Sequence, residues 1–243
     1  MKGTNLKTLV IMPTYNELES LPITLTQVLE ANPEVDLLVV DDNSPDGTGA
    51  LADSIALKNP RVSVLHRKTK DGLGGAYLTG FQWGFEQGYQ YLVEMDADGS
   101  HRPQDLPRLL AQAPKADLVI GSRWTTGGSV ENWPLYRKAI SRVGTFYAGI
   151  MLGSKVKDMT AGFRVYNTEF LKNLDLAGVN ARGYGFQVEM TWRTENAGGV
   201  IVEVPITFVE RTLGASKMST GIVLEALWLV TKWAFKKPIQ KQN

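Results

Sequence analysis

The sequence predicts an α/β protein in which helices flank a mostly parallel sheet. Three observations lead to this prediction. Short apolar runs recur through the first half of the chain, helical patterns separate them, and polar residues directly follow several of the runs. Strands that alternate with helices over short links form parallel sheets covered on both faces. The chain has 243 residues, 43% of them hydrophobic, which is enough to bury such a sheet.

The first apolar runs and helical patterns predict two successive strand–helix–strand units. Residues 9–12 (LVIM) predict a buried strand, and the apolar spacing over residues 20–31 predicts the helix after it. Residues 37–40 (LLVV) predict the second strand, and an Asn-Ser-Pro-Asp-Gly turn leads into a helix over residues 50–57. Residues 62–65 predict the third strand.

The same alternation continues to the middle of the chain. A glycine-rich start predicts a helix over residues 72–85, and Gly88 is placed to end it. Residues 91–95 predict the fourth strand, residues 106–113 a helix, and residues 118–121 a fifth strand.

The second half is less regular. Residues 135–152 predict a long helix and residues 200–204 a final strand. Residues 222–235 are almost wholly apolar, but these 14 residues are too few to span a membrane. Two interpretations fit this segment: a core helix, or an interfacial helix with aromatic and lysine anchors.

Composition narrows the classes of function. Lysine and arginine number 26 and aspartate and glutamate 25, so a net charge of +1 gives no electrostatic argument for nucleic acid. Cysteine is absent, so we expect neither disulfides nor thiolate chemistry, and a cytoplasmic setting fits. The N-terminal residues lack the features of a signal peptide.

Two carboxylates, Asp96 and Asp98, stand directly after the fourth strand. Carboxylates this close repel each other unless a cation lies between them or one is protonated. Hard divalent ions such as Mg²⁺ are commonly held by one or two carboxylates together with substrate phosphates. Taken alone, the pattern is more often a strand-ending turn with solvated acids. No glycine-rich phosphate loop follows the first strand, so a nucleotide held through a metal ion is the better interpretation.

Polar residues also follow the other strands of the predicted sheet. Tyr15 and Glu17 come after the first strand, and Asp41 and Asp42 end the second. Each cluster alone is typical of a turn. Because the carboxyl ends of parallel strands share one edge, where ligands bind, their recurrence predicts a binding crevice.

Three ordered motifs carry a family resemblance: PTYNE at 13–17, DDNSPDGT at 41–48 and DAD at 96–98. Together they resemble family 2 glycosyltransferases with a GT-A (Rossmann-like) fold, and more narrowly dolichol-phosphate or polyprenol-phosphate mannose synthases of the actinobacterial type. The resemblance implies inverting transfer of mannose from GDP-mannose to a polyprenyl (dolichyl-type) phosphate, with Mg²⁺ or Mn²⁺ as cofactor.

The resemblance also implies the residues of the site. A nucleotide-sugar site would be formed by Pro13, Tyr15, Glu17, Val40, Asp42, Asp96, Ala97, Asp98, Arg123, Arg182, Arg211 and Lys217. The metal would be held by Asp96 and Asp98. Ser100 stands where some relatives carry Gln, so the third metal contact is Ser100, His101 or water.

An acceptor-phosphate site is expected at Arg123, Arg137 and Ser141, which with Asp98 would be the catalytic residues. Arg137 and Ser141 lie one helical turn apart, and two arginines can clamp a phosphate. A solvated helix face is the ordinary alternative for such residues. The basic segment 211–217 resembles a loop that closes over the diphosphate.

The resemblance implies a catalytic domain over residues 1–219, followed by an apolar or interfacial helix and a basic tail over residues 220–243. We expect a peripheral protein at the cytoplasmic face of the membrane, whose partners are the membrane surface and, as in some relatives, a multi-spanning membrane protein. Two alternatives stay open: a UDP-glucose-dependent polyprenyl-phosphate glucosyltransferase, and a non-catalytic nucleotide-sugar-binding subunit.

Overall fold

The computed structural model describes residues 7–181, 183, 185–211 and 220–235. Its main sheet contains β1 (Thr8–Thr14), β2 (Val35–Asp41), β3 (Val62–His66), β4 (Tyr91–Glu94), β5 (Leu118–Ser122), β7 (Arg164–Asn167) and β8 (Ile201–Pro205). A two-stranded ribbon pairs β6 (Ser129–Glu131) with β9 (Thr207–Val209). The α-helices are α1 (Leu21–Ala31), α2 (Thr48–Ala56), α3 (Leu73–Glu86), α4 (Leu106–Leu110), α5 (Leu135–Leu152), α6 (Thr168–Lys172), α7 (Gly185–Asn196) and α8 (Thr220–Ala234).

The strand order of the main sheet is β3-β2-β1-β4-β7-β5-β8. Neighbouring strands are parallel except where β7 lies antiparallel between β4 and β5. The mostly parallel sheet expected from the sequence is therefore confirmed. The chain runs outward from β1 to β3 and then crosses to β4 on the other side of β1, so a ligand crevice forms between the carboxyl ends of β1 and β4.

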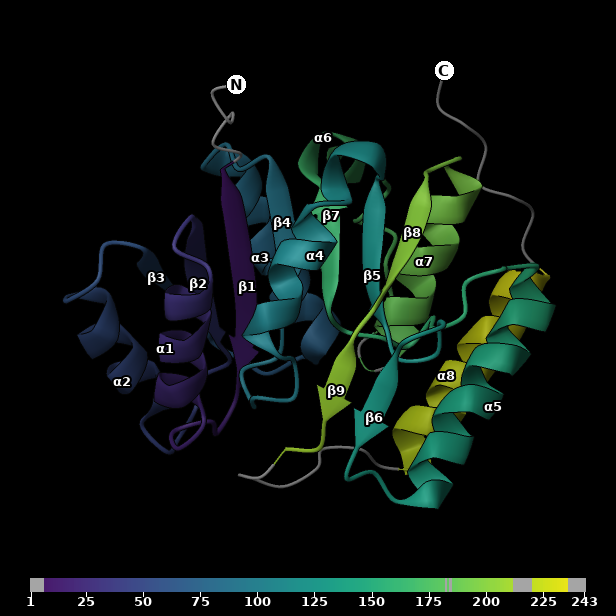
Figure 1. Ribbon diagram of the computed structural model, residues 1–243, viewed down its shortest axis with the longest axis horizontal. Coiled ribbons are helices and arrows are strands. Elements are labelled where there is room, and N and C mark those ends of the chain that lie inside the picture. Colours follow the sequence, from purple (N-terminus) through teal and green to yellow (C-terminus); the bar gives the residue numbers. More distant parts are fainter. Residues whose placement is uncertain (1–6, 182, 184, 212–219, 236–243) are drawn as a thin grey trace.

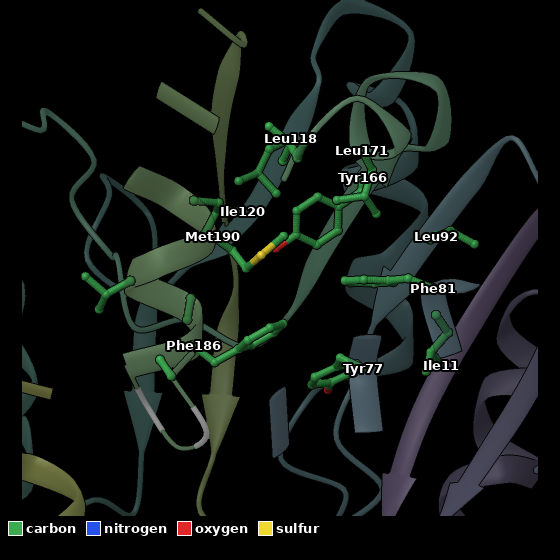
Figure 2. Packing of buried hydrophobic residues seen from close by; sticks show 14 of the residues in the cluster. Ile11, Tyr77, Phe81, Leu92, Leu118, Ile120, Tyr166, Leu171, Phe186 and Met190 are labelled. Atoms are coloured by element: carbon green, nitrogen blue, oxygen red, sulfur yellow. The ribbon is translucent and has the colours of Figure 1, made fainter. Parts of the chain in front are cut away.

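Alternating side chains of the buried strands build two cores, one on each face of the sheet. Helices cover both of these faces (Figure 1). Val10 and Met12 of β1 pack with apolar residues of α1 and α4. Leu9 and Ile11 point to the opposite face, where α3 and α7 lie. Figure 2 shows part of that second core, in which the rings of Tyr77 and Phe186 stack with centroids 6.0 Å apart. These two layers hold the sheet edge that carries the site.

Several elements differ from the prediction. The helix expected over residues 106–113 ends at Leu110, and a 3₁₀ turn follows over Ala113–Lys115 because Pro114 has no N–H to continue an α-helix. Strand β7 was not predicted, because its four residues begin with a fully buried arginine, Arg164. The guanidinium of Arg164 donates to the carbonyls of Ala161 at 2.7 Å and Met159 at 2.9 Å, which compensates its burial.

Helix α7 was not predicted either, because it has no polar face. Gln187, Glu189 and Arg193 are buried in it together with apolar residues. Arg193 donates to Glu189 at 2.8 Å, and a buried pair of this kind hides the amphipathic pattern that a sequence analysis looks for.

Helix α8 packs against α5 and α7. Trp233 stacks on Trp192 of α7 at 5.8 Å, and Thr231 shares a 2.6 Å hydrogen bond with Tyr147 of α5. The boundary expected at 219/220 adjoins residues outside the described part of the chain. Within the described residues, no helix is both long enough and apolar enough to cross a bilayer.

Candidate active site

Two adjoining hollows open at the carboxyl edge of the sheet, with volumes of about 280 Å³ and 150 Å³. The first, which we call the donor hollow, lies between β1, β2 and the start of α3. The second, the acceptor hollow, lies under the β6–β9 ribbon and between α5 and α8. Both are lined by Leu73, Asp96, Asp98 and Arg211. The acid pair therefore stands at the junction of the two hollows.

Most residues predicted for the nucleotide-sugar line the donor hollow: Pro13, Tyr15, Glu17, Asp42, Asp96, Ala97, Asp98 and Arg211. Val40 does not, because its side chain is fully buried in the core on the α3 side of the sheet. Arg123 lines the acceptor hollow instead. Arg182 and Lys217 lie outside the described residues, so their predicted roles stay predictions.

The two neighbouring aspartates at the end of β2, Asp41 and Asp42, have different roles. Asp41 is a turn anchor, because its carboxylate accepts from Thr14 Oγ1 at 2.9 Å and from Ser44 Oγ at 2.6 Å. Asp42 faces the donor hollow and accepts from Arg67 Nη1 at 2.7 Å. Burial raises the pKa of Asp42 above its ordinary value, although Arg67 opposes the shift.

The sequence analysis missed two basic residues beside the donor hollow, Arg67 and Lys70. Lys70 lines it, with Nζ 3.7 Å from the ring centroid of Tyr15. Both belong to the charged run that follows β3. That run lies at the same sheet edge as the motifs already singled out, which is the signal that could have found them.

At the junction, His101 positions Asp96. Its Nδ1 accepts the backbone N–H of Asp96 at 3.0 Å, so the neutral ring carries its proton on Nε2, 3.8 Å from Asp96 Oδ2. The ring stacks on Phe163 with centroids 5.0 Å apart. Burial lowers the pKa of His101, although Asp96 opposes the shift. A neutral, packed imidazole with this hydrogen bond serves to position Asp96.

Asp96 and Asp98 differ in their electrostatic surroundings. Burial raises the pKa of Asp96, although His101 opposes the shift. Burial also disfavours ionisation of Asp98, but Arg211, whose Nη2 lies 2.9 Å from Asp98 Oδ2, and the Ser100 N–H outweigh it and hold its pKa below the ordinary value. Asp98 is the firmly ionised member of the pair.

The oxygens present fit a hard divalent cation. Asp96 and Asp98 supply carboxylates, and the buried Oγ of Ser100 has no hydrogen-bond partner among the described residues. No group of three or more His, Asp or Glu side chains that could hold a metal occurs in the described part of the chain. An ion here would therefore need substrate oxygens or water to complete its coordination, as Mg²⁺ and Mn²⁺ commonly do.

Arg123 enters the acceptor hollow as half of a buried ion pair. Its Nε and Nη2 donate to Asp158 Oδ2 at 2.7 Å and Oδ1 at 2.6 Å. The backbone N–H of Arg123 also donates to Asp158, and Nη2 reaches Thr160 Oγ1 at 2.8 Å. Asp158 is thus the residue that fixes Arg123 in the wall of the hollow.

Arg137 and Ser141 of α5 lie on the same wall, as their spacing predicts. The guanidinium carbon of Arg137 lies 4.6 Å from the ring centroid of Trp133, and Nη1 donates to both carboxylate oxygens of Glu210, at 2.5 and 2.6 Å. Ser141 Oγ accepts from the indole N–H of Trp124 at 3.2 Å. The structure thus brings the three predicted acceptor residues into one hollow. It adds Trp133 and Glu210 to the lining and places Trp124 beside Ser141, and the sequence analysis assigned none of these three.

A second buried carboxylate, Glu94, lies two residues before Asp96. Its Oε2 accepts from Gln187 Nε2 at 2.7 Å, and Oε1 of each residue is unpaired among the described residues. Burial raises the pKa of Glu94 to about 7, although Arg164 opposes the shift. Gln187 also lines the acceptor hollow, where its free carbonyl oxygen offers an acceptor for a hydroxyl.

The family model described as glycosyl transferase family 2 matches residues 9–175. The chain is 60% identical over 228 residues to an undecaprenyl-phosphate mannosyltransferase of Micrococcus luteus, covering 94% of each chain. It is 54% identical over 232 residues to a polyprenol monophosphomannose synthase of Mycolicibacterium smegmatis, covering 95% of this chain and 88% of that one.

Solved structures agree in fold. A glucosyl-3-phosphoglycerate synthase of Mycobacterium tuberculosis with Mn²⁺, UDP-glucose and phosphoglyceric acid gives a TM-score of 0.69 at 17% identity, covering 94% of this chain and 79% of that one. A mannosyltransferase of Pyrobaculum calidifontis with GDP-Man and Mn²⁺ gives 0.56 at 17% identity, covering 94% and 71%. These likenesses concern the fold alone, and they confirm the expected GT-A class.

Proposed function

This chain belongs to glycosyl transferase family 2, and on that premise we propose that it transfers mannose from GDP-mannose to a polyprenyl phosphate with inversion. The family resemblance read from the sequence is confirmed. The names of both close relatives specify a polyprenol or undecaprenyl phosphate and mannose, and the Pyrobaculum calidifontis enzyme holds GDP-Man.

One observation carries the proposal: the acid pair separates a hollow suited to a nucleotide from a hollow suited to a phosphorylated lipid. The donor hollow combines Tyr15 and Lys70 with the acids Glu17 and Asp42, which can accept hydrogen bonds from a base and a ribose. The acceptor hollow combines Arg137 with apolar residues of α5 and α8. A reaction between the two ligands has to take place at the acid pair between them.

Asp96, Asp98 and Ser100 are the residues that would hold a divalent ion, Mg²⁺ or Mn²⁺. Such an ion, when bound, neutralises charge on the diphosphate of the donor and on the departing nucleotide. Mn²⁺ is present in both structural neighbours. His101 contributes by keeping the Asp96 backbone in place, and Arg211 by supplying positive charge beside Asp98.

On the acceptor side, Arg123, Arg137 and Ser141 would orient the phosphate for attack on the far face of the anomeric carbon. A phosphate monoester already carries about −1.5 to −2 charges near neutral pH, so no strong general base is needed. The buried His101 is unsuited to that role, because Nδ1 already accepts a hydrogen bond and Nε2 faces Asp96.

We further propose peripheral binding to a lipid bilayer through the outer faces of α5 and α8. Val143, Phe146 and Ile150 of α5 are 64–70% exposed, and Trp228 of α8 is 61% exposed. Exposed basic residues flank them: Arg142, Lys155, Lys157 and Lys232. An apolar face with basic flanks suits an anionic membrane surface, and the acceptor hollow opens between the same two helices.

Sedimentation with phosphatidylglycerol vesicles tests the membrane proposal. Phe146→Asp should weaken binding, whereas Leu57→Asp, which changes an 88% exposed leucine just after α2, should not. Equal vesicle binding by both variants would contradict it. Binding that needs an added membrane protein would instead favour the expected multi-spanning partner as the occupant of this face.

The catalytic proposal is tested by transfer of labelled mannose from GDP-mannose to an extractable polyprenyl phosphate, with Mn²⁺, Mg²⁺ or chelator. We expect a mild-acid-labile lipid product that requires a divalent ion and is lost in Asp98→Ala. Product from UDP-glucose alone would favour the glucosyltransferase. Donor binding without turnover would favour a binding subunit.

A further inference from the structure

Each described arginine that lines the acceptor hollow contacts a carboxylate of the protein itself. Arg123 pairs with Asp158, Arg137 with Glu210, and Arg211 with Asp98. An arginine that must bind a phosphate can keep such a partner or exchange it for the ligand. The surroundings of the three carboxylates separate these two cases.

The pair of Arg123 and Asp158 is built to persist. Asp158 is fully buried and accepts from the backbone N–H, Nε and Nη2 of Arg123. The backbone N–H of Asp158 donates to Glu203 at 3.0 Å, which fixes the carboxylate further. Breaking a pair of this kind would leave a buried charge uncompensated.

The pair of Arg137 and Glu210 is different. Glu210 comes directly after β9, its side chain is 22% exposed, and it lines the acceptor hollow. Both its carboxylate oxygens contact the same nitrogen, Nη1 of Arg137. The Nε of Arg137 is buried and has no partner among the described residues. The carboxylate therefore satisfies only part of the guanidinium.

We propose that Glu210 is a stand-in for the acceptor phosphate, which occupies its place on Arg137 until a phosphate monoester displaces it. The inference rests on the proposed function and adds a residue that controls access to the acceptor site. A phosphate monoester carries more charge than a carboxylate and offers three oxygens, so it can take Nη1 and the open Nε together. Trp133, 4.6 Å from the guanidinium carbon, holds the plane of Arg137 during the exchange.

The same segment links this exchange to the donor side. Glu210 and Arg211 are adjacent in the chain, and Arg211 contacts Asp98 at the junction of the hollows. A cation that binds Asp98, or a donor diphosphate that binds Arg211, competes with the ion pair between these two residues. Release of Arg211 loosens the segment that holds Glu210 on Arg137. The acceptor is therefore expected to bind more tightly after the donor, which limits futile capture of other phosphates.

Isothermal titration with geranyl phosphate, a short soluble isoprenyl phosphate, tests the inference in the full chain. Without nucleotide, Glu210→Gln should bind geranyl phosphate about tenfold more tightly than the wild type, which corresponds to about 1.4 kcal/mol. Addition of GDP and Mn²⁺ should tighten binding by the wild type and change the variant little. The matched control is Glu131→Gln on the neighbouring strand β6, which removes the same charge from an exposed side chain and should behave as wild type.

Two further variants keep the result interpretable. Arg137→Ala combined with Glu210→Gln should abolish the gain, because the gain depends on the freed guanidinium. Glu210→Asp keeps the charge on a shorter side chain and should give an intermediate affinity. Melting curves of all variants establish that they are folded.

Unchanged or weaker geranyl phosphate binding by folded Glu210→Gln would overturn the inference, since it would show that Glu210 merely orients Arg137. Failure of the wild type to bind geranyl phosphate even with GDP and Mn²⁺ would instead count against the proposed function. In that case inorganic phosphate decides on Glu210: a gain in Glu210→Gln but not in Glu131→Gln supports the stand-in role, and no gain refutes it.

Discussion

Replacing Asp158 by Asn should strongly destabilise the protein. Asp158 is fully buried and faces Arg123, which is only 6% exposed. The substitution removes the counter-charge of a guanidinium that donates to it at 2.6 and 2.7 Å. Breaking one side of a buried ion pair costs about 3–5 kcal/mol. In a chain of this length each kcal/mol lowers Tm by about 2–4 °C, so the expected fall is about 6–20 °C.

The assay is thermal and urea unfolding of the ligand-free protein. Asp175→Asn is the matched control, because it also removes a carboxylate from an arginine, Arg193. Asp175 is 57% exposed on its side chain, and Arg193 keeps its contact with Glu189 at 2.8 Å. The control should lose less than about 1 kcal/mol. Equal losses in the two variants would refute the argument that burial makes the Arg123 pair indispensable.

Three further predictions concern other parts of the fold. In ligand-free protein, the pKa of Glu94 is raised to about 7, whereas in the unfolded chain it is near 4.5. Between these pH values only the folded state keeps the proton on Glu94. The protonated Glu94 therefore stabilises the fold at low pH, and this stabilisation is lost as the pH rises from 4.5 to 7. Glu94→Gln should remove this pH dependence. The free energy of unfolding of the variant, relative to that of the wild type, should therefore rise by on the order of 3 kcal/mol from pH 4.5 to above 7. A difference between the two proteins that stays constant with pH in urea unfolding would contradict this. Gly80→Ala should destabilise the protein by about 1–3 kcal/mol, because the added Cβ would lie 2.5 Å from Ile11 Cγ2. Gly144→Ala should stabilise it by up to about 1 kcal/mol, because the added Cβ would have nothing within 4 Å and alanine favours a helix. Similar unfolding midpoints for the two variants would argue against this packing. Asp98→Asn should reduce Mn²⁺ binding measured by titration, and unchanged affinity would remove Asp98 from the metal site.

The sequence could predict those parts of the fold in which local pattern and environment agree. Residues 9–12 and 37–40 are continuous apolar runs in strands buried on both faces, and the structure places β1 and β2 there. Strand β7 and helix α7 were not predicted because they bury charged residues such as Arg164 and Glu189, whose partners lie three to five positions away in the chain. A pattern of apolar residues cannot reveal such compensation.

The candidate site divides in the same way. Residues that directly follow a strand, such as Tyr15 and Asp98, were predictable because a parallel sheet brings strand ends together. The partners that set their charge were not. Arg137 and Glu210 are separated by 73 positions and Glu94 and Gln187 by 93, and no local spacing rule connects positions so far apart.

The antiparallel strand β7 has a consequence for how the chain is synthesised. Strands β4 and β5 leave the ribosome before β7. Strand β4 can pair with β1 at once, but β5 has no neighbour until Arg164–Asn167 emerges and enters between β4 and β5. Until then β5 and the outer edge of β4 have unpaired backbone groups, which invite pairing with other chains. Unlike a fold made of two self-sufficient halves, this protein cannot be divided after Ser122, and a nascent chain of that length is the form most in need of a chaperone.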